Sequence, residues 1–200
     1  MARSIEIKLE GADDLRRYLA AMPRETESVL RSSVNRALKA AHNEALIQIT
    51  RKYTISMSGV EKDLREFTAR GGSIVARLVG SGRPRGALNF HVLPSERNPS
   101  PHAWTSKRGY IAEILHGAVE DISRDYFWIR LKGGNVHLAR RRDTTARDKD
   151  SSKDLHIFRT VSTPQMLGNE DVSKKVSEVT KATLEEVFAK GMERRLLKGI

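Results

Sequence analysis

The chain has 200 residues, of which 38% are hydrophobic and 30% are charged, and its formal net charge is +11. This length suits one domain with room for a long insertion, and the apolar share lies above the disordered range. The absence of cysteine excludes disulfides, thiolate metal sites and a thiol nucleophile. The positive charge favours an acidic partner: nucleic acid, an anionic membrane or an acidic protein surface.

The first quarter of the chain predicts one strand followed by helices. Residues 4–9 alternate between apolar and polar side chains, as in a half-buried strand, and a short helix is expected at 13–21. Residues 24–51 read as one long helix, because apolar residues recur at spacings of three and four. A connection at 53–59 and a short helix at 60–69 are expected to follow.

The rest of the chain predicts a run of strands and then a terminal helix. Strands at 73–79 and 87–93 are expected to form a hairpin around the basic turn SGRPRG. The clearest hairpin is FWIRLKGGNVHLAR, with its turn at Gly133, Gly134 and Asn135. Further strands are expected at 110–115 and 155–161. An amphipathic helix at 172–197 closes the chain, with Asn169 and Asp171 as cap candidates.

Segregated helices and strands of this kind predict an α+β fold. We expect a mainly antiparallel sheet packed against a long N-terminal helix and a C-terminal helix. The whole chain, residues 1–200, is interpreted as a single domain. Residues 94–109 and 143–153 are expected to be extended loops or arms.

No motif supports catalysis, a metal or a cofactor, so we predict a protein that is not an enzyme. The histidines show no zinc-ligand spacing, and they are His42, His91, His102, His116, His137 and His156. Carboxylate pairs at predicted helix starts are explained by the helix dipole. A metal-dependent nuclease remains the least favoured alternative, and its candidate residues are Glu113, Glu120, Asp121 and Lys132, with Glu120 and Asp121 expected in a turn.

Basic residues gather around both predicted hairpins, which leaves nucleic-acid binding open as an alternative. The first hairpin carries Arg77, Arg83 and Arg85, and Arg140 begins a basic run after the second. The competing interpretation is a positive face that is solvated or that meets an acidic neighbouring subunit. No apolar run approaches the roughly 18 residues that cross a bilayer, and the N-terminus lacks the apolar core of a signal peptide. We therefore expect a soluble protein without a membrane partner.

Three stretches resemble the minor tail protein Z family of tailed bacteriophages. The first is SSVNRALKAAHNEALIQITRKYTI (32–55), and the second is ARLVGSGRPRGALNFHVLPS (76–95). The third is YFWIRLKGGNVHLARR followed by LHIFRTVSTPQML (155–167), which ends in a Ser-x-Pro-Gln-Met turn before the last helix. Together they extend from residue 32 to the last helix. The segments at 94–109 and 143–153 are longer than the family's core leads one to expect.

The resemblance implies a structural virion protein that acts late in tail assembly. Such proteins resemble tail completion and neck components, which form rings between head connector and tail. It implies as partners copies of the chain itself in a six- or twelve-fold ring, the head connector, and the tail terminator and tube proteins. DNA in the central channel is a further candidate partner. The implied location is the virion neck, and the host cytoplasm during assembly. No catalytic residue is carried over from the family.

The candidate site residues are therefore interface residues. They are expected to contact a neighbouring subunit or the DNA channel, and they are Arg140, Arg141, Arg142, Trp104, Pro164, Gln165 and Met166. Each has a simpler interpretation: solvated charge for the arginines, a loop anchor for Trp104, and a helix-start turn for the last three.

Overall fold

The structure is a computed structural model that describes residues 5–6, 24–94, 109–131, 133–141 and 155–197. It confirms the α+β class, with a long N-terminal helix, a C-terminal helix and antiparallel strand pairing throughout. The strands form three small sheets of three strands each. This description covers the strands of the described residues.

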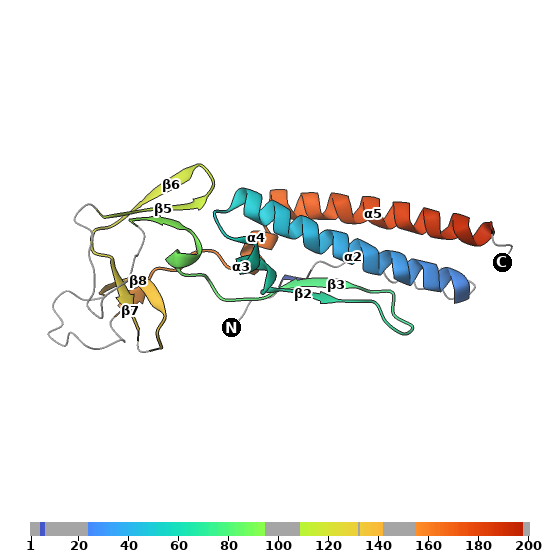
Figure 1. Ribbon diagram of the computed structural model, residues 1–200, viewed down its shortest axis with the longest axis horizontal. Helices are drawn as coiled ribbons and strands as arrows, with labels where there is room; N and C mark the ends of the chain where they lie inside the picture. Colours follow the sequence, from blue (N-terminus) through green and yellow to red (C-terminus); the bar gives the residue numbers. More distant parts are fainter. Residues whose placement is uncertain (1–4, 7–23, 95–108, 132, 142–154, 198–200) are drawn as a thin grey trace. The chain divides into compact units, whose positions relative to one another are not determined.

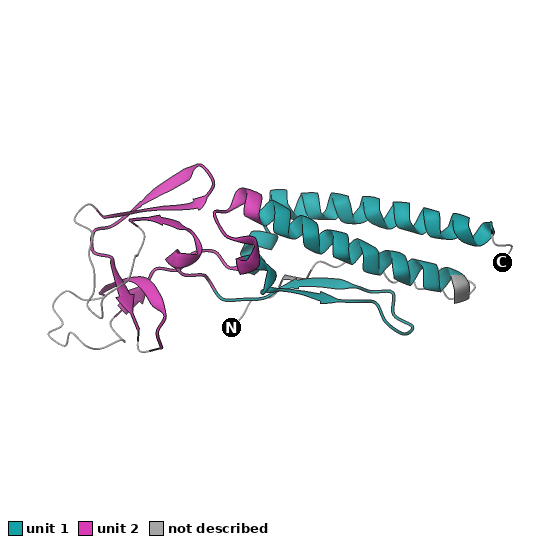
Figure 2. Cartoon of the chain, in the orientation of Figure 1, with its two compact units in different colours: residues 1–49, 60–83, 163–200 teal, residues 50–59, 84–162 magenta. Residues whose placement is uncertain are grey.

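The chain divides into two compact units, coloured separately in Figure 2. Unit 1 comprises Met1–Ile49, Val60–Arg83 and Thr163–Ile200, and unit 2 comprises Thr50–Gly59 and Pro84–Ser162. Each unit is built from segments far apart in the sequence. The expectation of a single domain stays a prediction.

Unit 1 combines two long helices with a small antiparallel sheet (Figure 1). Its helices are α2 (Arg24–Lys52, whose last turn belongs to unit 2), α4 (Thr163–Leu167) and α5 (Glu170–Leu196). Its strands, in the order β1-β3-β2, are β1 (Ile5–Glu6), β2 (Leu64–Phe67) and β3 (Arg77–Gly80). The short helix α3 (Met57–Glu61) crosses the boundary between the units.

Helix α2 forms because its sequence has no glycine or proline and is rich in good helix formers. Its apolar stripe is buried as predicted, at Leu30, Ala37, Leu38, Ala41, Ala45, Leu46 and Ile49. The side chain of Asn35 joins α2 to the segment after β2: its Nδ2 donates to the Ala69 carbonyl over 3.2 Å, and its Oδ1 accepts from the Ala69 N–H over 2.8 Å.

Helix α5 runs antiparallel beside α2 in Figure 1. It begins close to the predicted position, with Asn169 at the N-cap and Glu170 and Asp171 in the first turn, where carboxylates favour the helix dipole. Near its end, Gly191 faces Val29 of α2. A Cβ atom at Gly191 would lie 2.5 Å from Val29 Cγ1, so only glycine allows this approach.

The predicted helix at 60–69 is wrong, because β2 occupies that stretch. Leu64 and Glu66 point to one face, where Leu64 is buried and Glu66 contacts His42 of α2, while Arg65 and Phe67 point to the other. This two-residue period, together with pairing to β3, overrides the local helix signal. The expected connection at 53–59 is wrong in part, because α3 begins at Met57.

A buried hydroxyl links α4 to the segment between α3 and β2. Thr163, fully buried, donates its Oγ1–H to Asp63 Oδ2 over 2.9 Å. The Asp63 carbonyl in turn accepts from the Ser81 N–H over 2.7 Å, at the end of β3. Asp63 thus ties three segments of unit 1 together.

Unit 2 contains two sheets. The first has the order β4-β5-β6 and consists of β4 (His91–Leu93), β5 (Tyr110–Leu115) and β6 (Ala118–Ile122). The second has the order β7-β8-β9 and consists of β7 (Phe127–Arg130), β8 (Val136–Arg141) and β9 (Leu155–Ile157). A 3₁₀ turn at Ala87–Asn89 precedes β4.

The core of unit 2 lies around two aromatic side chains. Trp128 and Tyr110 are each 1% exposed, and their rings meet edge to face with centroids 6.2 Å apart. The cluster around them consists of Ala87, Val92, Ala112, Ile122, Tyr126 and Leu138.

The β7-β8 hairpin and strand β5 are confirmed, but two predictions about the strands are wrong. Residues 73–79 and 87–93 do not form a hairpin, because β3 pairs with β1 and β2 whereas β4 pairs with β5. Glu120 and Asp121 lie in strand β6 rather than in a turn. The turn falls earlier, at Gly117, whose φ of 80° glycine adopts without strain.

Candidate interaction surfaces

The two described arginines of the predicted interface lie at the end of β8, each over an aromatic ring. The Arg140 guanidinium lies 5.6 Å from the centre of the Tyr126 ring, and that of Arg141 lies 6.0 Å from the Phe127 ring. Such cation–π contacts orient a guanidinium without neutralising it. Arg140 is exposed, so its charge faces solvent.

Arg142 and Trp104 lie outside the described residues, as do the arm residues 95–108 and 143–153. Their predicted interface role stays a prediction.

The three predicted interface residues of α4 divide between surface and core. Pro164 and Met166 are buried in unit 1, and Met166 is 0% exposed. Pro164 lies against β3, where a Cβ atom at Gly80 would be 3.5 Å from the Pro164 Cα. Both residues therefore contribute to the packing of unit 1, and Gln165 is the exposed residue of the three. Their predicted interface role stays a prediction.

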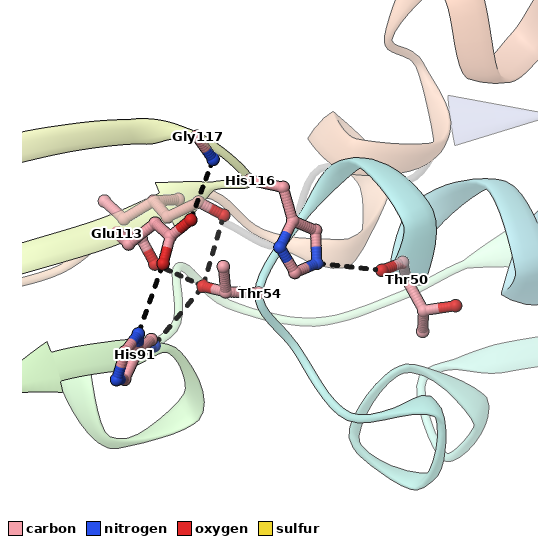
Figure 3. Close-up of polar contacts among 7 residues, drawn as sticks. Thr50, Thr54, His91, Glu113, His116 and Gly117 are labelled. Carbon is pink, nitrogen blue, oxygen red and sulfur yellow. Dashed lines mark hydrogen bonds and ion pairs between the residues drawn. The ribbon is translucent and has the colours of Figure 1, made fainter.

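Glu113 is the centre of a polar network that sequence reasoning did not identify (Figure 3). Its Oε1 accepts the Gly117 N–H over 2.7 Å, and its Oε2 lies 3.2 Å from His91 Nδ1. Its carbonyl accepts the hydroxyl of Thr54, whose Oγ1 accepts the His91 N–H over 3.3 Å. The network joins the segment after α2 to β4 and to the β5-β6 turn.

These contacts lower the pKa of the Glu113 carboxyl below its usual range. The hydrogen bond from the Gly117 N–H contributes most, the bond with His91 comes next, and the charges of His91 and His116 add to them. The arrangement stabilises the carboxylate and fixes the β5-β6 turn.

The lowered pKa predicts how stability depends on pH. Because the folded pKa lies below the unfolded one, the contribution of Glu113 is complete above the unfolded pKa and is lost as pH falls through the folded pKa. Between pH values of about 5 and 3, wild type should lose more stability than Glu113→Gln. Melting temperatures measured across this range test it.

The control is Glu120→Gln, because Glu120 lies on the neighbouring strand β6 and its carboxylate accepts no hydrogen bond among the described residues. The melting temperature of this variant should depend on pH as that of the wild type does. Equal slopes for wild type and Glu113→Gln would show that the network does not stabilise the ionised form.

Unit 1 carries an apolar groove between α2, α5 and β3, with a volume of about 460 Å³. Its lining is mainly apolar and includes Val34, Ala37, Leu38, Ala41, Ala76, Leu78, Val176 and Leu184. Lys181 and Glu185 of α5 also line it, and their charged groups lie 3.9 Å apart. The groove is therefore mainly apolar, with one pair of opposite charges in its lining.

Those of the nuclease candidates that the structure describes are not gathered into a metal site. Glu113 is engaged by His91 and Gly117, and Lys132 lies outside the described residues. Among the described residues, no group of three His, Asp or Glu side chains is placed to hold a metal ion. Within the same residues, no helix is long and apolar enough to span a membrane.

Comparison with known proteins provides no relative from which a role could be transferred. No family model, no curated protein and no solved structure matches the chain.

Proposed function

We propose that this chain is a structural virion protein of a tailed bacteriophage. It acts as a tail completion or neck component, and copies of it form a ring that joins the tail to the head connector. The proposal starts from the resemblance of three stretches to the minor tail protein Z family.

The observation that supports it most is the set of unpaired strand edges. All three sheets have three strands, and each outer strand has one open edge among the described residues; these strands are β1, β2, β4, β6, β7 and β9. Unpaired edges are a liability in an isolated protein, and neighbouring chains commonly cover them. A subunit that is completed by its neighbours in a ring fits this feature.

The test is the composition and shape of particles. Mass spectrometry of purified particles should detect the chain, and a phage that lacks it should accumulate separate heads and tails in electron micrographs. The proposal would be refuted if mass spectrometry did not detect the chain in purified particles. It would also be refuted if a phage that lacks the chain still assembled intact particles.

A second candidate function, binding of nucleic acid, is favoured by the net charge of +11 and by the exposed guanidinium of Arg140. It predicts that the isolated chain binds duplex DNA with an affinity that falls steeply as salt rises. Arg140→Ala should weaken this binding and flatten its salt dependence. Absence of binding at low salt would remove this candidate.

A further inference from the structure

One outward sheet face of unit 2 is apolar in its centre and acidic at its edge. Val92 and Ala112 point to the core, at 5% and 0% exposure, so the alternate residues of the β4-β5-β6 sheet point outward. Leu93 pairs with Ile111, and Ile111 pairs with Asp121. We call Leu93, Ile111, Val119 and Asp121 the acidic face.

The side chains of the acidic face are open to solvent. Leu93 is 48% exposed, Ile111 is 44% exposed and Val119 is 63% exposed. Asp121 is exposed too, and it forms no ion pair among the described residues. An apolar cluster of this kind beside an unpaired charge has the composition of a contact surface.

The sheet of unit 1 has an outward face of the opposite charge. Leu64 and Leu78 point inward, at 6% and 4% exposure, so their neighbours on β2 and β3 point outward. The outward residues form two cross-strand pairs, which are Arg65 with Val79 and Phe67 with Arg77. We call these four residues the basic face.

The basic face also has an exposed aromatic ring, and one of its two arginines lies against that ring. Phe67 is 46% exposed, and the Arg77 guanidinium lies 5.5 Å from the centre of its ring. Arg65 is exposed and has no ion pair among the described residues. Aromatic residues and arginine are the side chains that most often dominate the energy of protein contacts.

We propose that the acidic face of one copy docks on the basic face of a second copy, a contact that rests on the ring of the proposed function. Phe67 and Val79 would cover the exposed Ile111, Leu93 and Val119, while Arg65 and Arg77 approach Asp121. The opposite charges select this pairing over contact between two like faces. A single chain supplies both sides in equal numbers.

The two faces differ, so the contact is heterologous and leaves one face of each kind free for the next copy. Such head-to-tail contacts produce closed rings or open filaments.

Exchanging the charges of the two faces tests the pairing. One variant carries Asp121→Arg, and the other carries Arg65→Glu and Arg77→Glu. When either variant is studied alone, the two faces that should meet carry charges of the same sign. Its self-association should therefore be at least about tenfold weaker than that of the wild type. In an equimolar mixture, every contact between the two variants again joins opposite charges, so assembly should return. Analytical ultracentrifugation measures both effects.

The control carries Glu61→Arg, which adds the same charge as Asp121→Arg at an exposed position outside both faces. It should assemble like wild type. Circular dichroism verifies that each variant is folded. If the double variant of the basic face does not fold, the single variant Arg65→Glu replaces it.

Assembly of either folded variant at wild-type strength would overturn the contact, and so would a mixture that does not recover. A wild-type chain that is monomeric at its highest soluble concentration would overturn it as well. The proposed function is decided separately, by the presence of the chain in particles.

Discussion

Replacing Trp128 with alanine should lower the free energy of unfolding by about 3–5 kcal/mol, the range for removal of a large buried aromatic side chain. Trp128 is 1% exposed, packs edge to face on Tyr110, and donates its Nε1–H to the Pro94 carbonyl over 3.3 Å. The variant loses the ring contacts and leaves a cavity in the core of unit 2. Urea unfolding followed by circular dichroism measures the loss.

The matched variant Trp128→Phe keeps a ring in the core but removes the indole N–H. It should lose clearly less stability than Trp128→Ala, because only part of the volume and one hydrogen bond disappear. A loss below about 1 kcal/mol for Trp128→Ala would show that this cluster does not hold unit 2 together.

Met166→Ala should destabilise unit 1 by about 2–5 kcal/mol, because the side chain is fully buried and its removal leaves a cavity. Its neighbour Gln165 is exposed, so Gln165→Ala should lower the free energy of unfolding by clearly less than Met166→Ala does. Chemical denaturation of both variants provides the comparison.

The same pair of variants separates core from interface at α4. If Met166 served an interface, Met166→Ala would weaken self-association while leaving the stability of the single chain unchanged. If Gln165 serves one, Gln165→Ala should weaken self-association alone. Sedimentation beside the unfolding experiment distinguishes these outcomes.

The elements predicted correctly are those whose signal is local. Helices α2 and α5 follow from long runs with a helical period, and the β7-β8 hairpin follows from its alternation around Gly133 and Gly134. Strand β2 was missed because LREF is too short for its period to stand out, and its partner β3 lies beyond two glycines. The pairing of β4 was missed because its partner β5 begins at Tyr110, far along the chain.

The polar network at Glu113 could not be read from the sequence. Thr54, His91 and Glu113 come from three separate segments, and the strand pairing of β4 with β5 brings the last two together. Arg140 was proposed as an interface residue because a basic run after a hairpin is a visible pattern. The ring beneath it belongs to Tyr126, across the hairpin, and only the strand register places it there.

The glycine at position 191 fixes how closely the two long helices approach. A Cβ atom there would meet the methyl group of Val29, so any side chain acts as a wedge that forces the helices apart at that end. Residues of both helices also line the apolar groove. A side chain at position 191 that forces the helices apart would therefore widen the groove. The hydrogen atom that Gly191 carries in place of a side chain thus sets the spacing of the two helices that line the groove.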